Sequence, residues 1–182
     1  MQARTTNNVT PASQQPVLFD PERIFQTLLK YEVRFVVIGM FAAVMQGARE
    51  VTEDVDVTPE RNAQNLAKLC QALRSLNAVV LDGEGNPVPK VQLDEQHLEI
   101  WRVTHLQTSA GNIDVVLDPA AAHGYSDLAS HSHSRTIPGG EEVLVLSLKR
   151  VIESKRASDR EKDHKVLPRL ESLLREQEGS DG

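Results

Sequence analysis

Two aspartates, Asp54 and Asp56, stand two residues apart in the run Asp-Val-Asp-Val. In an extended strand, residues two apart point to the same face, so the two carboxylates would lie side by side while Val55 and Val57 face the core. Two like charges at this separation repel each other, but a divalent cation reverses the sign of the interaction. The spacing therefore indicates a site for Mg²⁺ or Mn²⁺, although the tetrapeptide alone also fits an ordinary half-exposed strand.

A third acidic ligand is needed to complete a two-metal site. Asp114 is the best candidate because it lies in a separate apolar run, Ile113 to Leu117, which predicts a strand of its own. Asp118 would share the face of Asp114 if that strand continued, but Pro119 indicates that the strand has ended there. We therefore prefer Asp114 as the third ligand.

Gly39 supplies the complementary element for a phosphate. It follows the β-branched and aromatic run Phe35 to Ile38 and precedes a helix-favouring stretch that lasts until Gly47. The sequence thus predicts a strand, a glycine turn and a short helix. Backbone N–H groups at the start of a helix can meet phosphate oxygens, so a phosphate site would face the metal site.

The elements that must position these residues are predicted from caps and apolar periodicity. Helices are expected at 20–31, from the run Thr58-Pro59-Glu60, after the cap Ser147, and from about Asp159, the last kinked or split at Pro168. Further strands are expected at 78–81, 97–106 and 143–146. These elements predict an α+β fold, a mixed sheet of about five strands flanked by helices, with C-terminal helices.

Composition and charge indicate the domain organisation, the partners and the cellular location to expect. We expect one domain over residues 17–176, with disordered tails at 1–16 and 177–182. The net charge of -6 argues against wide coating of nucleic acid, although the stretch from Ser147 to Glu176 is locally basic, with nine Lys or Arg against six Asp or Glu. Cys70 is predicted to be a buried thiol, and no signal or membrane-spanning run is apparent, so a cytoplasmic protein that does not contact the membrane is expected.

Other residues with reactive or aromatic side chains fit structural roles better than catalytic or binding roles. His131 and His133 lack further ligands at zinc spacing and are expected in a loop with Ser132 and Ser134, which show no hydrolase elbow. Trp101 is interpreted as a packing anchor rather than a base-stacking platform.

The order of these motifs resembles the signature of the DNA polymerase beta-like nucleotidyltransferase superfamily. The run Val37-Ile38-Gly39-Met40-Phe41-Ala42-Ala43 precedes Arg49-Glu50-Val51-Thr52-Glu53-Asp54-Val55-Asp56-Val57, as a glycine turn precedes an Asp-x-Asp strand in that superfamily. The Arg-x-x-Thr before the acids and the later stretch from Ser154 to Asp163 look like small bacterial proteins related to abortive-infection toxins of the AbiEii type. The resemblance spans residues 35–174.

The resemblance implies roles for particular residues. Asp54 and Asp56 would bind the metals, and Asp114 would help to activate the acceptor hydroxyl. The nucleotide would contact Gly39 and Met40, together with Arg49 and Thr52. Lys155 and Arg160 would approach phosphates or acceptor, although without the resemblance Lys155, Arg160 and Lys162 fit a solvated helix face better. Met40 departs from the second small residue that is usual after Gly39.

The expected activity is transfer of a nucleoside monophosphate from an NTP to an acceptor hydroxyl. The acceptor could be RNA such as tRNA, a protein side chain, or a small molecule such as an antibiotic, and a toxin-like enzyme would have an antitoxin partner. The rival hypothesis is a binding or regulatory module that keeps the fold without turnover, which the large side chain of Met40 favours.

Overall fold

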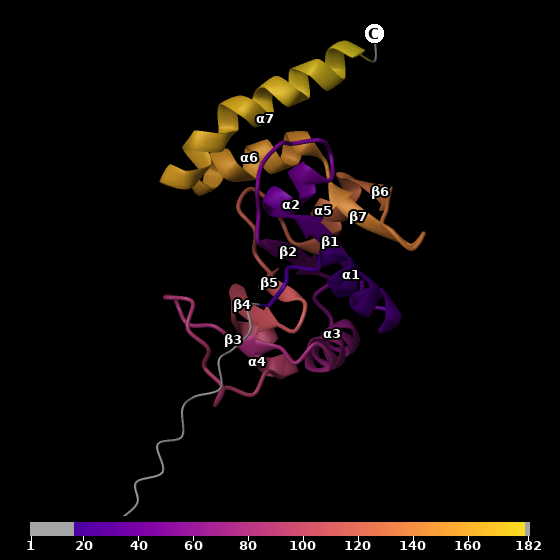
Figure 1. Ribbon diagram of the computed structural model, residues 1–182, viewed down its shortest axis with the longest axis vertical. Helices are drawn as coiled ribbons and strands as arrows, with labels where there is room; N and C mark the ends of the chain where they lie inside the picture. The colour runs from indigo at the N-terminus through magenta and orange to yellow at the C-terminus, as the bar shows by residue number, and fades with distance from the viewer. Residues whose placement is uncertain (1–16, 181–182) are drawn as a thin grey trace, which may run out of the picture.

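The apolar run at 35–38 lies inside a mixed sheet in the computed structural model, which describes residues 17–180 (Figure 1). The strands are β1 (Phe35–Ile38), β2 (Asp54–Pro59), β3 (Val79–Val80), β4 (Val103–Thr108), β5 (Gly111–Val116), β6 (Ser132–Thr136) and β7 (Glu142–Leu146). The helices are α1 (Pro21–Lys30), α2 (Gly39–Val44), α3 (Ala63–Ser75), α4 (Glu95–Ile100), α5 (Tyr125–Ser130), α6 (Leu148–Ser158) and α7 (Glu161–Ser180). The expected N-terminal tail, residues 1–16, lies outside the described part.

The strand order is β3-β4-β5-β2-β1-β7-β6. The pairs β1–β7 and β2–β5 are parallel, and the remaining neighbours are antiparallel. The expected α+β fold with a mixed sheet is therefore confirmed. Within residues 17–180 the sheet has seven strands, however, where the sequence predicted about five.

The strand that sequence patterns missed is β6, which replaces the loop expected around His131 and His133. Its side chains are mostly exposed, so it shows no apolar alternation. It forms because its backbone pairs with β7 over its full length, from Ser132 opposite Leu146 to Thr136 opposite Glu142. A polar strand at the edge of a sheet gives little signal in the sequence.

Two helix boundaries differ from the expected ones because side-chain caps decide them. The prediction of a strand over 97–106 was wrong in its first half, since Asp94 Oδ1 accepts the backbone N–H of His97 at 2.9 Å and α4 follows. The helix expected from Thr58-Pro59-Glu60 begins only at Ala63. The Asn62 side chain caps it by accepting the N–H of Asn65, and β2 extends to Pro59.

The last helix, α7, contains Pro168 without a break, so the expected split does not occur. Proline removes a single backbone hydrogen bond there, and two contacts after the proline attach the helix to the rest of the protein. The Arg169 guanidinium pairs with Glu50, and Gln177 Nε2 donates to the Gln46 carbonyl at 2.7 Å. The helix begins at Glu161 rather than Asp159 and continues to Ser180, into the stretch expected to be a tail.

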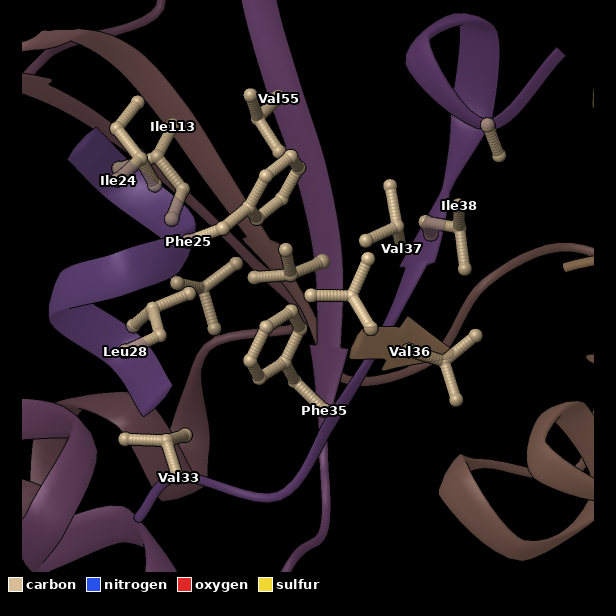
Figure 2. Close-up of a cluster of buried hydrophobic side chains, with 14 of the residues drawn as sticks. Ile24, Phe25, Leu28, Val33, Phe35, Val36, Val37, Ile38, Val55 and Ile113 are labelled. Atoms are coloured by element: carbon tan, nitrogen blue, oxygen red, sulfur yellow. The ribbon is translucent and has the colours of Figure 1, made fainter. Parts of the chain in front are cut away.

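The main core lies between α1 and one face of the sheet. Figure 2 shows Ile24, Phe25 and Leu28 of α1 pointing toward Val55 of β2 and Ile113 of β5. These five side chains are almost fully buried. Alternation along β2 and β5 then places Asp54, Asp56 and Asp114 on the opposite face, away from α1.

The remaining helices complete the architecture. In Figure 1, α6 and α7 lie together at the end of the molecule remote from α3 and α4. Cys70 of α3 is buried, as expected. We find no helix in residues 17–180 that has the length and apolar character to cross a membrane.

Asn65 fixes the junction between β1 and β2, and sequence patterns gave no sign of this role. Its buried amide accepts the Arg34 N–H at 2.7 Å and donates to the carbonyls of Arg34 and Glu60, both at 2.9 Å. These bonds satisfy backbone groups at the start of β1 and just beyond the end of β2.

Replacing Asn65 with Ala leaves the part-buried Arg34 N–H without its partner, whereas the carbonyls of Arg34 and Glu60 each lose one of two hydrogen bonds and still accept the N–H groups of Glu60 and Asn62. We expect Asn65→Ala to lower the free energy of unfolding by about 2 kcal/mol, because an unsatisfied buried group costs about 1–3 kcal/mol. Urea unfolding followed by circular dichroism measures this. The control Gln64→Ala changes an exposed neighbour on the same helix, and equal losses in both variants would contradict the assignment.

Candidate functional site

A row of side chains crosses four neighbouring strands at the level of Asp56. His105 of β4 is paired with Asp114 of β5, Asp114 with Asp56 of β2, and Asp56 with Ile38 of β1. Asp54 lies two residues before Asp56 and therefore shares its face. The strand register thus brings together the three carboxylates that the sequence singled out.

The carboxylates border a cavity of about 510 Å³ between the sheet and the helices α6 and α7. Its sheet side includes the three aspartates and His105, and its opposite side is formed from α6 and α7. The lining residues that bear on the chemistry are Gly39, Met40, Thr52, Asp54, Asp56, His105, Asp114, Asp118, Lys155, Arg160, Lys162 and Asp163. The cavity therefore has an acidic wall and a wall that carries basic residues.

Gly39 has to be glycine because the Asp56 carboxylate lies against it. A Cβ atom at this position would stand 2.0 Å from Asp56 Oδ2, and the backbone φ is +65°. Both the close approach and the left-handed backbone exclude an ordinary side chain. The glycine turn thus shapes the carboxylate pocket directly. Met40 beside it also lines the cavity and packs against the core.

The carboxylates affect each other's ionisation. Burial, with added repulsion from Asp54 and Asp114, raises the pKa of Asp56 to about 7. Burial also raises the pKa of Asp114, although the hydrogen bond from His105 opposes that shift. Like charges are therefore concentrated where solvent cannot screen them fully, and a bound cation would relieve the repulsion.

Two of the three carboxylates are held by neighbouring side chains. Thr52 Oγ1 donates to Asp54 Oδ1 at 2.6 Å, and His105 Nδ1 lies 2.8 Å from Asp114 Oδ2. Each bond engages one carboxylate oxygen. Thr52, whose predicted contact with the nucleotide stays a prediction, bonds to Asp54. His105 was missed by the sequence patterns.

The junction of α6 and α7 is organised by Asp163, whose side chain is 1% exposed. It accepts hydrogen bonds from Lys155 Nζ at 2.9 Å, Ser158 Oγ at 2.6 Å and Arg160 Nε at 2.8 Å. Burial opposes ionisation of Asp163, but these three donors outweigh it and hold the carboxyl pKa well below its usual range. Lys155, expected to approach phosphates, is therefore already engaged in a buried ion pair.

Lys162, which the sequence patterns assigned to a solvated helix face, lies in the basic wall of the cavity. It is exposed and lines the cavity, and its charge lowers the pKa of both Asp56 and Asp114. Among residues 17–180 we find no hydrogen bond or ion pair to its ammonium group. Arg160 uses Nε for Asp163 and keeps a side chain that is 57% exposed. These two cations are available to a ligand.

Most of the residues expected at the site line one cavity. Gly39, Met40, Lys155 and Arg160 lie there with the three aspartates and Thr52. Arg49 is the exception, because it is exposed and lies outside the lining residues. Asp118 also borders the cavity, with a half-exposed side chain 3.6 Å from Arg102 Nε.

The donor set suits a hard divalent ion, because carboxylate oxygens are the ligands that Mg²⁺ prefers. Within residues 17–180, no group of three or more His, Cys, Asp or Glu side chains forms a ready-made metal cage. The three carboxylates suit a divalent cation because they share one cavity and are partly desolvated. Water or substrate oxygens would be needed to complete the coordination.

Comparison with known proteins identifies the fold. The lincosamide antibiotic adenylyltransferase LnuA, solved with lincomycin bound, matches 86% of this chain and 99% of its own, with a TM-score of 0.55 and 14% identity. A putative nucleotidyltransferase from Thermotoga maritima matches 84% of this chain and 94% of its own, with a TM-score of 0.51 and 15% identity. No family model and no curated protein matches the sequence.

At these identities the likeness concerns the fold alone. The chain therefore has the fold of nucleotidyltransferases, as its sequence motifs predicted. The finer relation to abortive-infection toxins has no support from these matches and stays a prediction.

The contact between Gly39 and Asp56 can be tested by adding a single methyl group. We expect Gly39→Ala to lower the free energy of unfolding by about 2 kcal/mol more than Gly47→Ala, because overpacking typically costs about 1–3 kcal/mol. Gly47 is a matched control: its φ is also positive, at +101°, but a Cβ there would meet nothing within 4 Å. Urea unfolding of both variants measures the difference. Equal destabilisation would mean that backbone strain alone requires Gly39.

Proposed function

We propose that this chain transfers a nucleoside monophosphate from an NTP to an acceptor hydroxyl. The observation that carries the proposal is the convergence of Asp54, Asp56 and Asp114 on one cavity whose opposite wall presents Arg160 and Lys162. An NTP joined to divalent cations needs this combination of oxygen ligands and cations. The fold shared with nucleotidyltransferases supports the same reading.

The acidic wall would hold Mg²⁺ or Mn²⁺. Asp54 and Asp56 extend side by side from β2, and Asp114 joins them from β5. When bound, the metal would polarise the phosphate and favour an ionised acceptor oxygen. The aspartates are positioned by the strand register before substrate arrives, so they need little reorganisation, and a bound cation would favour their charged form.

The basic wall would neutralise phosphate charge outside the metals. Arg160 and Lys162 are suited to this task because both line the cavity. Arg160 uses only its Nε for Asp163, which leaves its two terminal nitrogens for a ligand. Lys155 would act indirectly: it holds Asp163, and Asp163 in turn orients Arg160. Gly39 and Met40 would border the nucleotide at the start of α2.

Two classes of acceptor can be proposed, small molecules and RNA. LnuA was solved with the antibiotic lincomycin, which suggests a small-molecule hydroxyl as one acceptor. The basic stretch from Ser147 to Glu176 favours an RNA such as tRNA. An antitoxin partner would follow only from the resemblance to toxin-like proteins. The rival function is nucleotide binding without turnover, which the presence of Met40 in the cavity wall supports.

The reaction can be tested by label transfer. Purified protein is incubated with Mg²⁺, each labelled NTP, and either total tRNA, a panel of hydroxyl-bearing antibiotics or the protein itself. We expect transfer to one acceptor class and a loss of at least about 100-fold in Asp56→Asn, since the variant lacks a carboxylate that would hold the metal, and weakening one source of electrostatic stabilisation of the transition state costs about this much. Glu53→Gln, an exposed neighbour, should retain activity.

Two results would count against the proposal. Transfer by Asp56→Asn at the wild-type rate would remove the carboxylate site from the reaction. Nucleotide binding without transfer to any acceptor would favour the rival function.

The different roles of the two lysines give a second test. Lys162→Met should weaken binding of a fluorescent NTP analogue about 10-fold, the effect of losing roughly 1.4 kcal/mol, with little change in stability. Lys155→Met should instead lower the free energy of unfolding by about 3 kcal/mol, because the buried Asp163 carboxylate loses the more buried of its two cations and keeps only Arg160.

The control for this pair is Lys165→Met, since Lys165 forms an exposed ion pair with Glu161 and does not line the cavity. A stable Lys155→Met protein that has lost nucleotide affinity would mean that Lys155 binds phosphate directly, as the sequence suggested.

A further inference from the structure

A histidine and an aspartate face each other across the β4–β5 hairpin. His105 and Asp114 are register partners, and His105 Nδ1 lies 2.8 Å from Asp114 Oδ2. His105 borders the cavity with a side chain that is 51% exposed, whereas the Asp114 side chain is 17% exposed. The contact therefore lies at the edge of the site, with the carboxylate on its inner side.

The backbone holds this contact in place. The two strands pair continuously from Val103 opposite Val116 to Thr108 opposite Gly111. Thr108 Oγ1 closes the turn by donating to the Gly111 carbonyl and accepting the Ala110 N–H. Neither strand can slide without breaking this turn, so the two side chains need little further ordering to meet.

The same arrangement recurs at a second carboxylate of the site. Thr52 Oγ1 donates to Asp54 Oδ1, so each of the two aspartates has one oxygen bound by a neighbour and one oxygen free of such a bond. Asp56 accepts no hydrogen bond among the described residues. Side-chain donors that restrain ligating carboxylates or histidines commonly fix their orientation toward a metal.

We propose that His105 is a positioning residue that orients Asp114 as a metal ligand by donating from Nδ1 to Oδ2. This rests on the proposed function only in that it assumes a cation in the acidic wall. His105 would not touch the metal. It would keep the second oxygen of Asp114, Oδ1, available to the cation.

The alternative is an exposed pair of no functional consequence, since surface ion pairs contribute little. Under that alternative, removal of His105 would leave metal affinity unchanged. Under our proposal, removal would weaken metal binding about 10-fold to 100-fold, the range found for partners that orient metal ligands.

Binding of Mn²⁺ to the full chain, followed by electron paramagnetic resonance of the free ion, tests the proposal without requiring turnover. We expect His105→Ala to weaken Mn²⁺ binding at least about 10-fold and His105→Asn to restore most of it, because the Asn amide nitrogen occupies the place of His Nδ1. His133→Ala is the control, since His133 is exposed on the distant strand β6. Melting temperatures without metal should be the same in all variants.

The outcomes separate the two proposals. Wild-type affinity in His105→Ala would overturn the role of His105, whatever the transfer assay shows. Equal loss in His105→Ala and His105→Asn would also overturn it, because the ring would then be acting as a direct ligand. Loss in His105→Ala with rescue by Asn would support it even if no NMP transfer were found. A wild-type chain that binds no Mn²⁺ would overturn both the positioning role and the metal-dependent reaction.

Discussion

The register of β2 between β1 and β5 is the constraint on which the site depends. It places Asp56 beside Asp114 on one side and beside Ile38, next to Gly39, on the other. A slip of one residue would turn both β2 aspartates into the core and bring Val55 and Val57 to the cavity. The complete burial of those two valines opposes such a slip. Burial of the apolar face of β2 thus fixes the register that places its two aspartates in the cavity.

The helices above the site depend on a second set of interactions. Asp159, in the left-handed conformation at φ 50°, reverses the chain between α6 and α7, and Asp163 then draws Lys155, Ser158 and Arg160 together. A separate tie, between Arg169 and Glu50, joins α7 to the loop before β2. That loop carries Thr52, which holds Asp54. The position of α7 is therefore coupled through covalent and ionic links to one of the carboxylates.

The sequence predicted the parts of the site that follow from local rules. Period two along a strand determines that Asp54 and Asp56 share a face, and a glycine between strand and helix indicates a special backbone. The role of Lys155 could not be predicted, because its partner Asp163 comes into reach only after the chain reverses. His105 could have been found from the turn at 109–111, which sets it opposite Asp114, but a strand assumed to begin at residue 97 obscured that hairpin.

The acidic wall costs stability, because burial and mutual repulsion both disfavour the charged form of Asp56. Such a cost persists only when other contacts over-determine the local structure. Here the opposite face of the same strands supplies them, with α1 packed against Val55 and Ile113. The two faces of β2 and β5 therefore have opposite energetic roles: the apolar face stabilises the strands, and the acidic face costs stability. A cation bound by the aspartates would remove much of the repulsion, so the chain should be least strained when its site is filled.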